Sequence, residues 1–247
     1  MARPVLVKLG GSVITDKHRP FSLRRRVLYR LARELRSARA PVVLVHGGGS
    51  FGHPLVRKYG GNLLAGFLKI HQAMVRLNSE VMEALHRAGI PAISLSPSSF
   101  IQLKGGEIYK SELFLVRWLV KRGMTPVTYG DVFPDGRGVS ILSGDKLARY
   151  LALKLHAKLA IFCVDVDGIY LQEEGGITLA KEFSAKDLPK LAELPGATDV
   201  TGGMRGKVEE LLKLVEGGVD VLLINGLKKG LLARALRGDR GLGTAIY

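Results

Sequence analysis

Residues 41–53 read Pro-Val-Val-Leu-Val-His-Gly-Gly-Gly-Ser-Phe-Gly-His, and the fold can be worked out from this stretch. Its first residues are mostly apolar or β-branched and three glycines follow, which is the pattern of a buried strand that leads into the N-terminus of a helix. A second apolar run at 5–9 also ends in glycines, and the segment 23–38 between the two runs carries apolar residues at helical spacing. Together these three segments predict a βαβ unit, the building block of a parallel sheet.

Segments of the same two kinds alternate along the rest of the chain. Glycine turns at 104–107 and 135–136 predict hairpins, and 243–246 is a candidate for the last strand of the sheet. The sequence therefore predicts an α/β fold whose sheet is mostly parallel, with antiparallel pieces attached. Further strands are expected at 92–95, 125–129, 159–164 and 219–224, and further helices at 66–87, 145–156, 204–216 and 230–237.

The length of 247 residues suits one large domain or two lobes that share a continuous sheet. With 47% hydrophobic and 24% charged residues the chain can build a core, which excludes both a disordered chain and a small disulfide-stapled scaffold. No apolar run reaches the ~20 residues that a membrane-spanning helix needs, and the N-terminus leads directly into a strand, so we expect a cytoplasmic protein. The single cysteine, Cys163, excludes an intrachain disulfide framework and a multi-cysteine metal site, and we expect it to be a small buried hydrophobe.

The charge of the chain indicates an anionic partner. There are 37 basic and 22 acidic residues, which gives a net charge of +15 and a pI near 10.1. The basic residues are spread along the whole chain and aromatic residues make up 6%, so a nucleic-acid surface with base-stacking platforms is poorly supported. A small phosphorylated substrate fits the charge equally well. Few Asn and Gln residues beside many Lys and Arg residues are also typical of thermophile proteins.

Four glycine-bearing segments lie where predicted strands end or helices begin, which is where open α/β sheets bind their ligands. Their glycines let backbone N–H groups approach phosphate oxygens without hindrance from a Cβ atom. None of them matches the GxxxxGK[ST] pattern of a Walker A loop. The segments are Lys8-Leu-Gly-Gly-Ser12 with Lys17 on the same loop, His46-Gly-Gly-Gly-Ser-Phe-Gly-His53, Ser143-Gly-Asp145 and Thr201-Gly-Gly-Met-Arg-Gly-Lys207.

Each of these segments also has a simpler interpretation. A glycine pair is often a tight turn, Lys8 can be a surface lysine, and Asp145 can simply favour the first turn of a helix. His53 and His71 can be ordinary histidines, and for His71 we prefer that interpretation. The joint occurrence of four glycine loops, three of which carry Lys or His, favours a phosphate-binding site over coincidence.

These motifs, together with Val164-Asp-Val-Asp-Gly-Ile-Tyr170, resemble the amino-acid kinase superfamily, and within it the isopentenyl phosphate kinases. The resemblance runs from residue 5 to residue 246 with the motifs in order. The discriminating residue is His53 at the end of Gly-Ser-Phe-Gly-His, because the uridylate, carbamate, acetylglutamate and aspartate kinases of the superfamily lack a histidine there. Fosfomycin kinase has a comparable histidine.

The resemblance implies a single amino-acid kinase domain, 1–247, folded as a three-layer αβα sandwich, with an acceptor-binding lobe at 1–144 and a nucleotide-binding lobe at 145–247. The implied reaction transfers the γ-phosphoryl group of ATP to isopentenyl phosphate, giving isopentenyl diphosphate and ADP for isoprenoid biosynthesis by the alternative mevalonate route. The acceptor oxygen is already ionised, so no general base is needed. Mg²⁺ is expected with ATP, a homodimer is expected, and neither nucleic acid nor a membrane is an expected partner.

By the same resemblance, five residues are catalytic. Lys8 stabilises the group in transfer and Asp145 orients it, Lys17 and Lys207 hold the β- and γ-phosphates, and His53 donates a hydrogen bond to the acceptor phosphate. No protein ligand is assigned to the metal. The substrate-binding residues are Gly48, Gly49, Gly52, His53, Ser143 and Gly144, and the ATP-binding residues are Lys8, Gly10, Gly11, Ser12, Lys17, Asp165, Asp167, Gly168, Ile169, Gly202, Gly203 and Lys207. An apolar slot for the isoprenoid tail is assigned to Ile70, Met74, Leu77 and Ile141, for which a place in the core is the simpler interpretation.

Two alternatives stay open. The first is the same fold acting on another acidic acceptor, such as UMP or a fosfomycin-like phosphonate, and His53 argues against UMP. The second is a non-catalytic basic protein that binds nucleotides or nucleic acid, for which the charge is the support. The presence of Lys8, Lys17, Asp145 and Lys207 argues against this second alternative.

Overall fold

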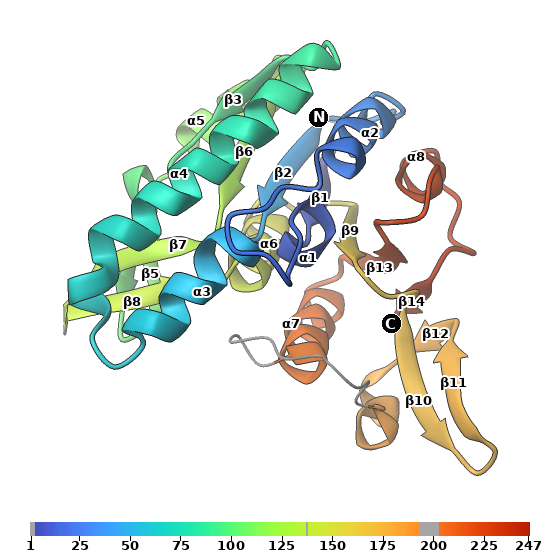
Figure 1. Cartoon of the computed structure of the whole chain (residues 1–247). Coiled ribbons are helices and arrows are strands. Elements are labelled where there is room, and N and C mark those ends of the chain that lie inside the picture. The colour runs from blue at the N-terminus through green and yellow to red at the C-terminus, as the bar shows by residue number, and fades with distance from the viewer. Residues whose placement is uncertain (1–2, 137, 193–202) are drawn as a thin grey trace.

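The computed structural model describes residues 3–136, 138–192 and 203–247, and a central eight-stranded sheet runs through them (Figure 1). The strand order is β12-β14-β13-β9-β1-β2-β6-β3. All neighbours pair in parallel except β13 and β14, so the mostly parallel sheet predicted from the sequence is confirmed. The strands are β1 (Val5–Leu9), β2 (Val42–His46), β3 (Ala92–Ser94), β6 (Thr125–Tyr129), β9 (Leu159–Val164), β12 (Glu182–Phe183), β13 (Asp220–Asn225) and β14 (Thr244–Ile246).

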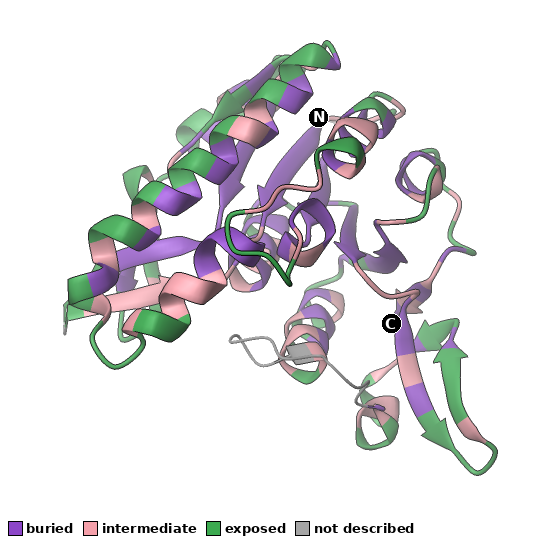
Figure 2. Ribbon diagram, viewed as in Figure 1, coloured by how far each residue is buried: buried purple, intermediate pink, exposed green. Residues whose placement is uncertain are grey.

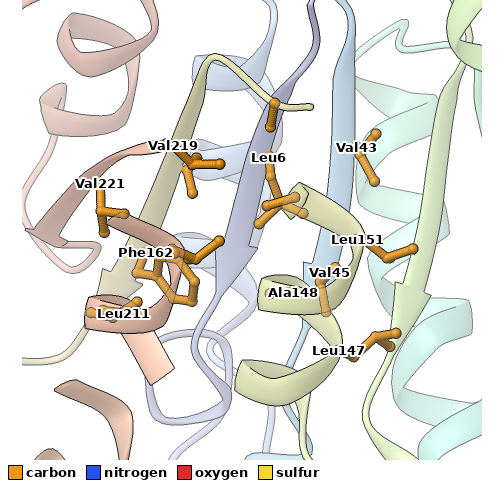
Figure 3. Close-up of a cluster of buried hydrophobic side chains, with 14 of the residues drawn as sticks. Leu6, Val43, Val45, Leu147, Ala148, Leu151, Phe162, Leu211, Val219 and Val221 are labelled. Carbon is orange, nitrogen blue, oxygen red and sulfur yellow. The ribbon is translucent and has the colours of Figure 1, made fainter. Parts of the chain in front are cut away.

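Helices cover both faces of this sheet, which confirms the three-layer αβα sandwich. Successive side chains of a strand point to opposite faces, so Leu6 packs with one helical layer while Val5 and Val7 pack with the other. The first layer comprises α5 (Phe114–Lys121), α6 (Gly144–Lys154) and α7 (Gly203–Glu216), and the close-up in Figure 3 shows side chains of α6 and α7 against strand residues such as Phe162. The second layer comprises α2 (Arg25–Leu35), α4 (Leu63–Arg87) and α8 (Leu231–Leu236).

The central strands are buried along their whole length. Every residue of β1, β2, β6 and β9 is buried, and Figure 2 shows these strands in purple between helices whose outer faces are exposed. A strand covered on both faces needs a nearly continuous apolar run, which is why these segments were recognisable in the sequence. Cys163, in β9, is fully buried as predicted.

Two smaller sheets lie beside the sandwich. One has the order β5-β4-β7-β8 and contains both predicted hairpins, and the other is a β10–β11 hairpin. The Asp135 carboxylate ties the two predicted turns together, because it accepts hydrogen bonds from the Gly105 and Gly106 amides at 2.8 and 2.6 Å. The strands are β4 (Ile101–Lys104), β5 (Glu107–Ser111), β7 (Asp131–Asp135), β8 (Gly138–Leu142), β10 (Ile169–Glu173) and β11 (Gly176–Ala180).

The predicted elements are present, and their ends differ by a few residues. The long helix α4 begins at Leu63 rather than residue 66, because the Asn62 side chain caps it by accepting a hydrogen bond from the Ala65 amide at 3.1 Å. The predicted helix at 23–38 is shorter, and α2 spans Arg25–Leu35. Helix α5 and strands β10 to β12 were not predicted. The remaining short elements are α1 (Gly11–Ile14), α3 (Gly49–Tyr59), η1 (Pro97–Ser99) and η2 (Ala185–Lys190).

Within the part of the chain that the structure describes, every helix falls short of the length or the apolar character that a membrane crossing requires.

Candidate active site

A cleft of about 740 Å³ opens at the carboxyl ends of β1, β2, β6 and β9. The glycine segments after β1 and β2, the turn before α6 and the first turns of α7 all contribute to its walls, so the structure brings together the four segments that the sequence singled out. This is the edge of a parallel sheet at which ligands bind in open α/β folds. The cleft wall is predominantly basic, since it contains Lys8, Lys17, His18, His53, Arg57, Arg205 and Lys207 against Asp131, Asp145 and Asp165.

A buried carboxylate between two lysines forms the floor of the cleft. Lys8 Nζ lies 2.7 Å from Asp145 Oδ1, and Lys207 Nζ lies 2.8 Å from Asp145 Oδ2. The alternation of strand β1 places Lys8 on the same face as Leu6, the face covered by α6 and α7. Asp145 lies in the first turn of α6 and Lys207 lies near the start of α7, so the three side chains meet where two helices and a strand converge.

The two lysines keep Asp145 ionised. Burial by itself raises the pKa of this carboxyl, but the charges of Lys207 and Lys8 outweigh it and hold the pKa well below its ordinary value. The three groups together carry a net charge of +1 at the floor of the cleft. An arrangement of this kind presents ammonium groups in a fixed position to an anion above them.

The two N-terminal glycine loops touch backbone to backbone. A Cβ atom at Gly11 would overlap the Gly49 backbone, and one at Gly49, where φ is +47°, would overlap Gly11 and the Thr15 hydroxyl. Thr15 Oγ1 joins the loops, since it donates to the Gly11 carbonyl at 2.7 Å and accepts from the Ser50 amide at 2.8 Å. Glycine is required here because only a chain without Cβ atoms can cross this closely. The backbone amides of both loops are thereby held at the cleft.

Helix α3 carries His53 to one wall of the cleft. Gly48 and Gly52 line the cleft beside it, and Met74 packs against both, with its Sδ 3.0 Å from the position of a Cβ atom at Gly48. Arg57 lies one turn further along α3 and lines the same cleft.

Lys17 and Asp165 face each other across the mouth of the cleft. Lys17 Nζ lies 3.4 Å from Asp165 Oδ2, and the lysine side chain is 45% exposed. Both line the cleft, as do Val166 and Gly168 from the loop after β9. The contact joins the loop that follows β1 to the loop that follows β9.

The end of the cleft formed by α4 and the β7–β8 hairpin has an apolar wall and one buried carboxylate. Ile70 and Met74 of α4 line it together with Val132 and Ile141 of the β7–β8 hairpin, whereas Leu77, also assigned to this wall, lies in the core and is not part of it. The part of α4 that lines the cleft is about one helical turn long, from Ile70 to Met74. Leu77 lies about one turn beyond it and is therefore outside the cleft.

Asp131 is the carboxylate at this end, and it pairs with His71. His71 Nδ1 lies 2.7 Å from Asp131 Oδ2, and Asp131 Oδ1 accepts from its neighbour's amide, Val132 N, at 2.8 Å. Burial raises the pKa of Asp131, and the hydrogen bond from His71 acts against that rise. His71 is therefore not an isolated surface histidine, because its ring links α4 to β7.

Some of the residues assigned from the sequence lie outside the cleft wall. Asp167 turns away and contacts Asn225 and Lys228, and Ile169 is fully buried as the first residue of β10. In the 165–169 segment Asp165, Val166 and Gly168 line the cleft. Gly203 is the first residue of α7, and Gly202 lies outside the described residues. Gly10, Gly11, Ser12, Gly49, Ser143 and Gly144 line the cleft as assigned.

Several cleft residues escaped the sequence analysis. Asp131 follows Gly130 at the end of the predicted strand 125–129, so its place at a carboxyl strand end was a usable indication. Arg57 stands in no quoted motif, whereas Tyr170 and Arg205 belong to motifs quoted above but were given no role there. All three line the cleft. Among the described residues, no group of three or more His, Cys, Asp or Glu side chains is arranged to hold a metal ion.

Comparisons with known proteins agree with this geometry. The model of the Amino acid kinase family matches residues 3–225. The isopentenyl phosphate kinase of Methanothermobacter thermautotrophicus is 38% identical, with 98% of each chain covered, and that of Methanocaldococcus jannaschii is 34% identical, with 95% of each covered. A solved structure of isopentenyl phosphate kinase matches with a TM-score of 0.85 at 35% identity, covering 99% of this chain and 100% of the other. The chain therefore belongs to the amino acid kinase family and, within it, to the isopentenyl phosphate kinases.

Proposed function

We propose that this chain transfers the γ-phosphoryl group of ATP to isopentenyl phosphate and releases isopentenyl diphosphate and ADP. The observation that carries the proposal is the buried Lys8–Asp145–Lys207 arrangement at the floor of a cleft that has a histidine and an apolar wall on one side. Its relatives among the isopentenyl phosphate kinases support the choice of acceptor.

The chemistry requires positioned cations rather than a base. The acceptor is a phosphate monoester, whose attacking oxygen is ionised near neutral pH, so the barrier comes from bringing two anions together in line. Lys8 lies between acceptor and donor phosphates and stabilises the equatorial oxygens of the group in transfer. Asp145 holds the Lys8 ammonium in place and accepts a hydrogen bond from Lys207, which binds the donor phosphates with Lys17.

The acceptor lies at the end of the cleft nearest α3 and α4. His53 donates a hydrogen bond to its phosphate, and the amides around Gly48 and Gly49 at the start of α3 offer further donors. The isopentenyl tail lies against Ile70, Met74 and Ile141. This wall excludes water from one side of the acceptor and gives the slot its apolar character.

The nucleotide occupies the half of the cleft formed by the loop after β9 and the start of α7. Strands from residues before 145 lie on one side of β1 in the central sheet and those from later residues on the other, which supports an acceptor lobe at 1–144 and a nucleotide lobe at 145–247. The three carboxylates among the described cleft residues are already paired: Asp145 with two lysines, Asp131 with His71 and an amide, and Asp165 with Lys17. This donor set fits a Mg²⁺ ion held by the phosphates of ATP and by water, which would neutralise phosphate charge.

We also propose a homodimer formed through the N-terminal half. Helix α4 exposes Leu64 and Leu68, at 71% and 63%, and the edge strand β3 exposes Ile93 at 42%. Large exposed apolar side chains on a helix and on an edge strand are features that an interface between copies would cover. Light scattering coupled to gel filtration measures the mass, and a monomer at all concentrations would refute the dimer. The cytoplasmic location expected from the composition stays a prediction.

The decisive experiment is a coupled ADP-release assay with Mg-ATP and four acceptors: isopentenyl phosphate, dimethylallyl phosphate, UMP and fosfomycin. We expect selective turnover of isopentenyl phosphate, with the diphosphate identified by mass spectrometry and turnover lost in Lys8→Met. Turnover of UMP or fosfomycin in place of isopentenyl phosphate would refute the proposed acceptor and identify another one. Absence of turnover with ATP still bound would retain the nucleotide half of the proposal and refute the acceptor half.

A further inference from the structure

The turn at 226–230, between β13 and α8, is held by an arginine from the opposite end of the chain. Arg30, on α2, donates from Nη2 to the Gly226 and Leu227 carbonyls at 2.5 and 3.2 Å and from Nη1 to the Lys228 carbonyl at 3.0 Å. Its planar guanidinium group thus binds three consecutive carbonyls of one turn. A lysine ammonium, which lacks the rigid fork, does not match such a set.

Glu34, one turn further along α2, completes the arrangement. Its Oε1 accepts from Arg30 Nη1 at 2.7 Å and from the Gly230 amide at 2.9 Å, and its Oε2 accepts from the Ala233 amide at 3.3 Å. The two side chains are 15% and 10% exposed, so the contacts are largely shielded from water. We refer to Arg30 and Glu34 together as the clamp. It satisfies backbone groups on both sides of the turn, which a free surface turn would leave to solvent.

The turn at 226–230, held by the clamp, also positions Asp167. Asn225, at the end of β13, donates from Nδ2 to Asp167 Oδ1 at 2.8 Å and accepts from the Leu227 amide within the turn at 2.9 Å. Lys228, whose own carbonyl is bound by Arg30, places its Nζ 2.7 Å from the same Oδ1. These hydrogen bonds, with Lys228 as the larger contributor, lower the pKa of Asp167 and keep it ionised.

Asp167 belongs to the segment 165–168, whose other members form the nucleotide wall of the cleft. Asp165, Val166 and Gly168 line the cleft, and Asp165 faces Lys17. Asp167 itself points away from the cleft, so its contacts fix the segment from behind. A continuous set of contacts therefore runs from α2 through the turn at 226–230 to the cleft.

We propose that Arg30 and Glu34 are positioning residues for nucleotide binding: by holding the turn at 226–230 they fix Lys228 and Asn225 against Asp167, and thereby the 165–168 wall of the cleft. The inference rests on the proposed binding of ATP in this half of the cleft. The proposal predicts different effects on the two substrates, because among the described residues the hydrogen bonds of the clamp go to the turn at 226–230 and to α8, and not to α3, α4 or the β7–β8 hairpin. Loss of the clamp should weaken ATP binding and leave the acceptor side unchanged.

The test measures the dissociation constant of ATP by calorimetry, and the KM of each substrate, for the full chain and its Arg30→Met variant. We expect the dissociation constant and the KM for ATP to rise about tenfold, the range of such indirect couplings, with the KM for isopentenyl phosphate within about twofold of wild type. Arg30→Lys should restore part of the loss. The control is Arg33→Met, which removes the same charge from the same helix at an exposed side chain whose hydrogen bond goes to the Tyr29 carbonyl of α2 rather than to the turn, and it should bind ATP as the wild type does.

A double-mutant cycle with Lys228→Met separates positioning from a general loss of stability. If the clamp acts through Lys228, the Arg30→Met and Lys228→Met effects on ATP binding will be smaller together than their sum. Additive effects, or equal losses for both substrates, would overturn the proposal. Lys228 is 58% exposed, so its variant tests the inference even where Arg30→Met fails to fold. A wild-type chain that does not bind ATP would refute the proposed function, whereas wild-type binding that both variants retain would refute the clamp.

Discussion

His46 gives a quantitative prediction about stability. It ends β2 beneath the glycine loops with its ring completely buried, stacked on Tyr129 at 5.2 Å between centroids. Its Nε2 lies 3.3 Å from Asn78 Oδ1 and its Nδ1 3.2 Å from the Gly47 carbonyl. Burial, which removes the charged form from water, lowers the pKa of His46 from 6.5 to about 4.

The direction of the pH effect follows from where the proton binds. Between pH 6.5 and about 4 the unfolded chain protonates this histidine and the folded chain does not. The free energy of unfolding therefore falls as the pH drops through this range, and the stability that neutral His46 provides is complete above pH 6.5. At 1.36 kcal/mol per pKa unit, the loss attributable to His46 amounts to about 3 kcal/mol.

Urea unfolding of the wild type and of His46→Gln, followed by circular dichroism from pH 7.5 to pH 4, measures this difference. We expect His46→Gln to lose about 3 kcal/mol less than the wild type across that range, whatever its stability at pH 7.5. His86→Gln makes the same exchange at an exposed histidine, and its curve should keep the wild-type slope. Parallel curves for the wild type and His46→Gln would refute the reasoning, because the burial of the ring would then not govern the pH dependence.

Four further substitutions test the site. Lys8→Met should lower kcat by about 10²–10³ with the fold retained, since it removes a donor to the group in transfer; rapid-quench measurements under saturating substrates report this, and an unchanged chemical step would exclude the role. Asp145→Asn leaves two buried lysines without a counter-charge and should cost about 3–5 kcal/mol of stability in urea unfolding. Gly11→Ala forces a Cβ atom into the opposite glycine loop and should destabilise by about 1–3 kcal/mol, which a Tm unchanged in calorimetry would contradict. His53→Ala should cost about 2–4 kcal/mol in kcat/KM for the acceptor with ATP binding retained, and equal losses for both substrates would exclude the assignment.

The elements of the central sheet were predictable because their information is local. A strand that is covered on both faces reads as a continuous apolar run, and the helices between such runs show an apolar stripe. Elements whose burial is one-sided or slight escaped prediction, as α5 and β10 to β12 did, because their residues are individually unremarkable and packing against the sandwich decides their conformation.

The candidate site, like the fold, was predictable only in its local features. Glycines at strand ends are local features, so Gly11 and Gly49 could be singled out, but that they cross one another was not visible in the sequence. The 165–168 segment shows the limit most clearly. Its two aspartates are equivalent in the sequence, yet Asp165 faces the cleft and Asp167 turns to Lys228.

The sequence by itself determined the order of strands and helices, the glycine loops at the strand ends, and the family to which these motifs point. The tertiary structure decided which side chains meet. Lys8 pairs with Asp145 across 137 residues, and Arg30 binds the carbonyl of Gly226 across 196. Periodicity and turn chemistry act over a few neighbouring residues, whereas these contacts depend on strand order, register and helix packing, which emerge only when the whole chain buries its apolar faces.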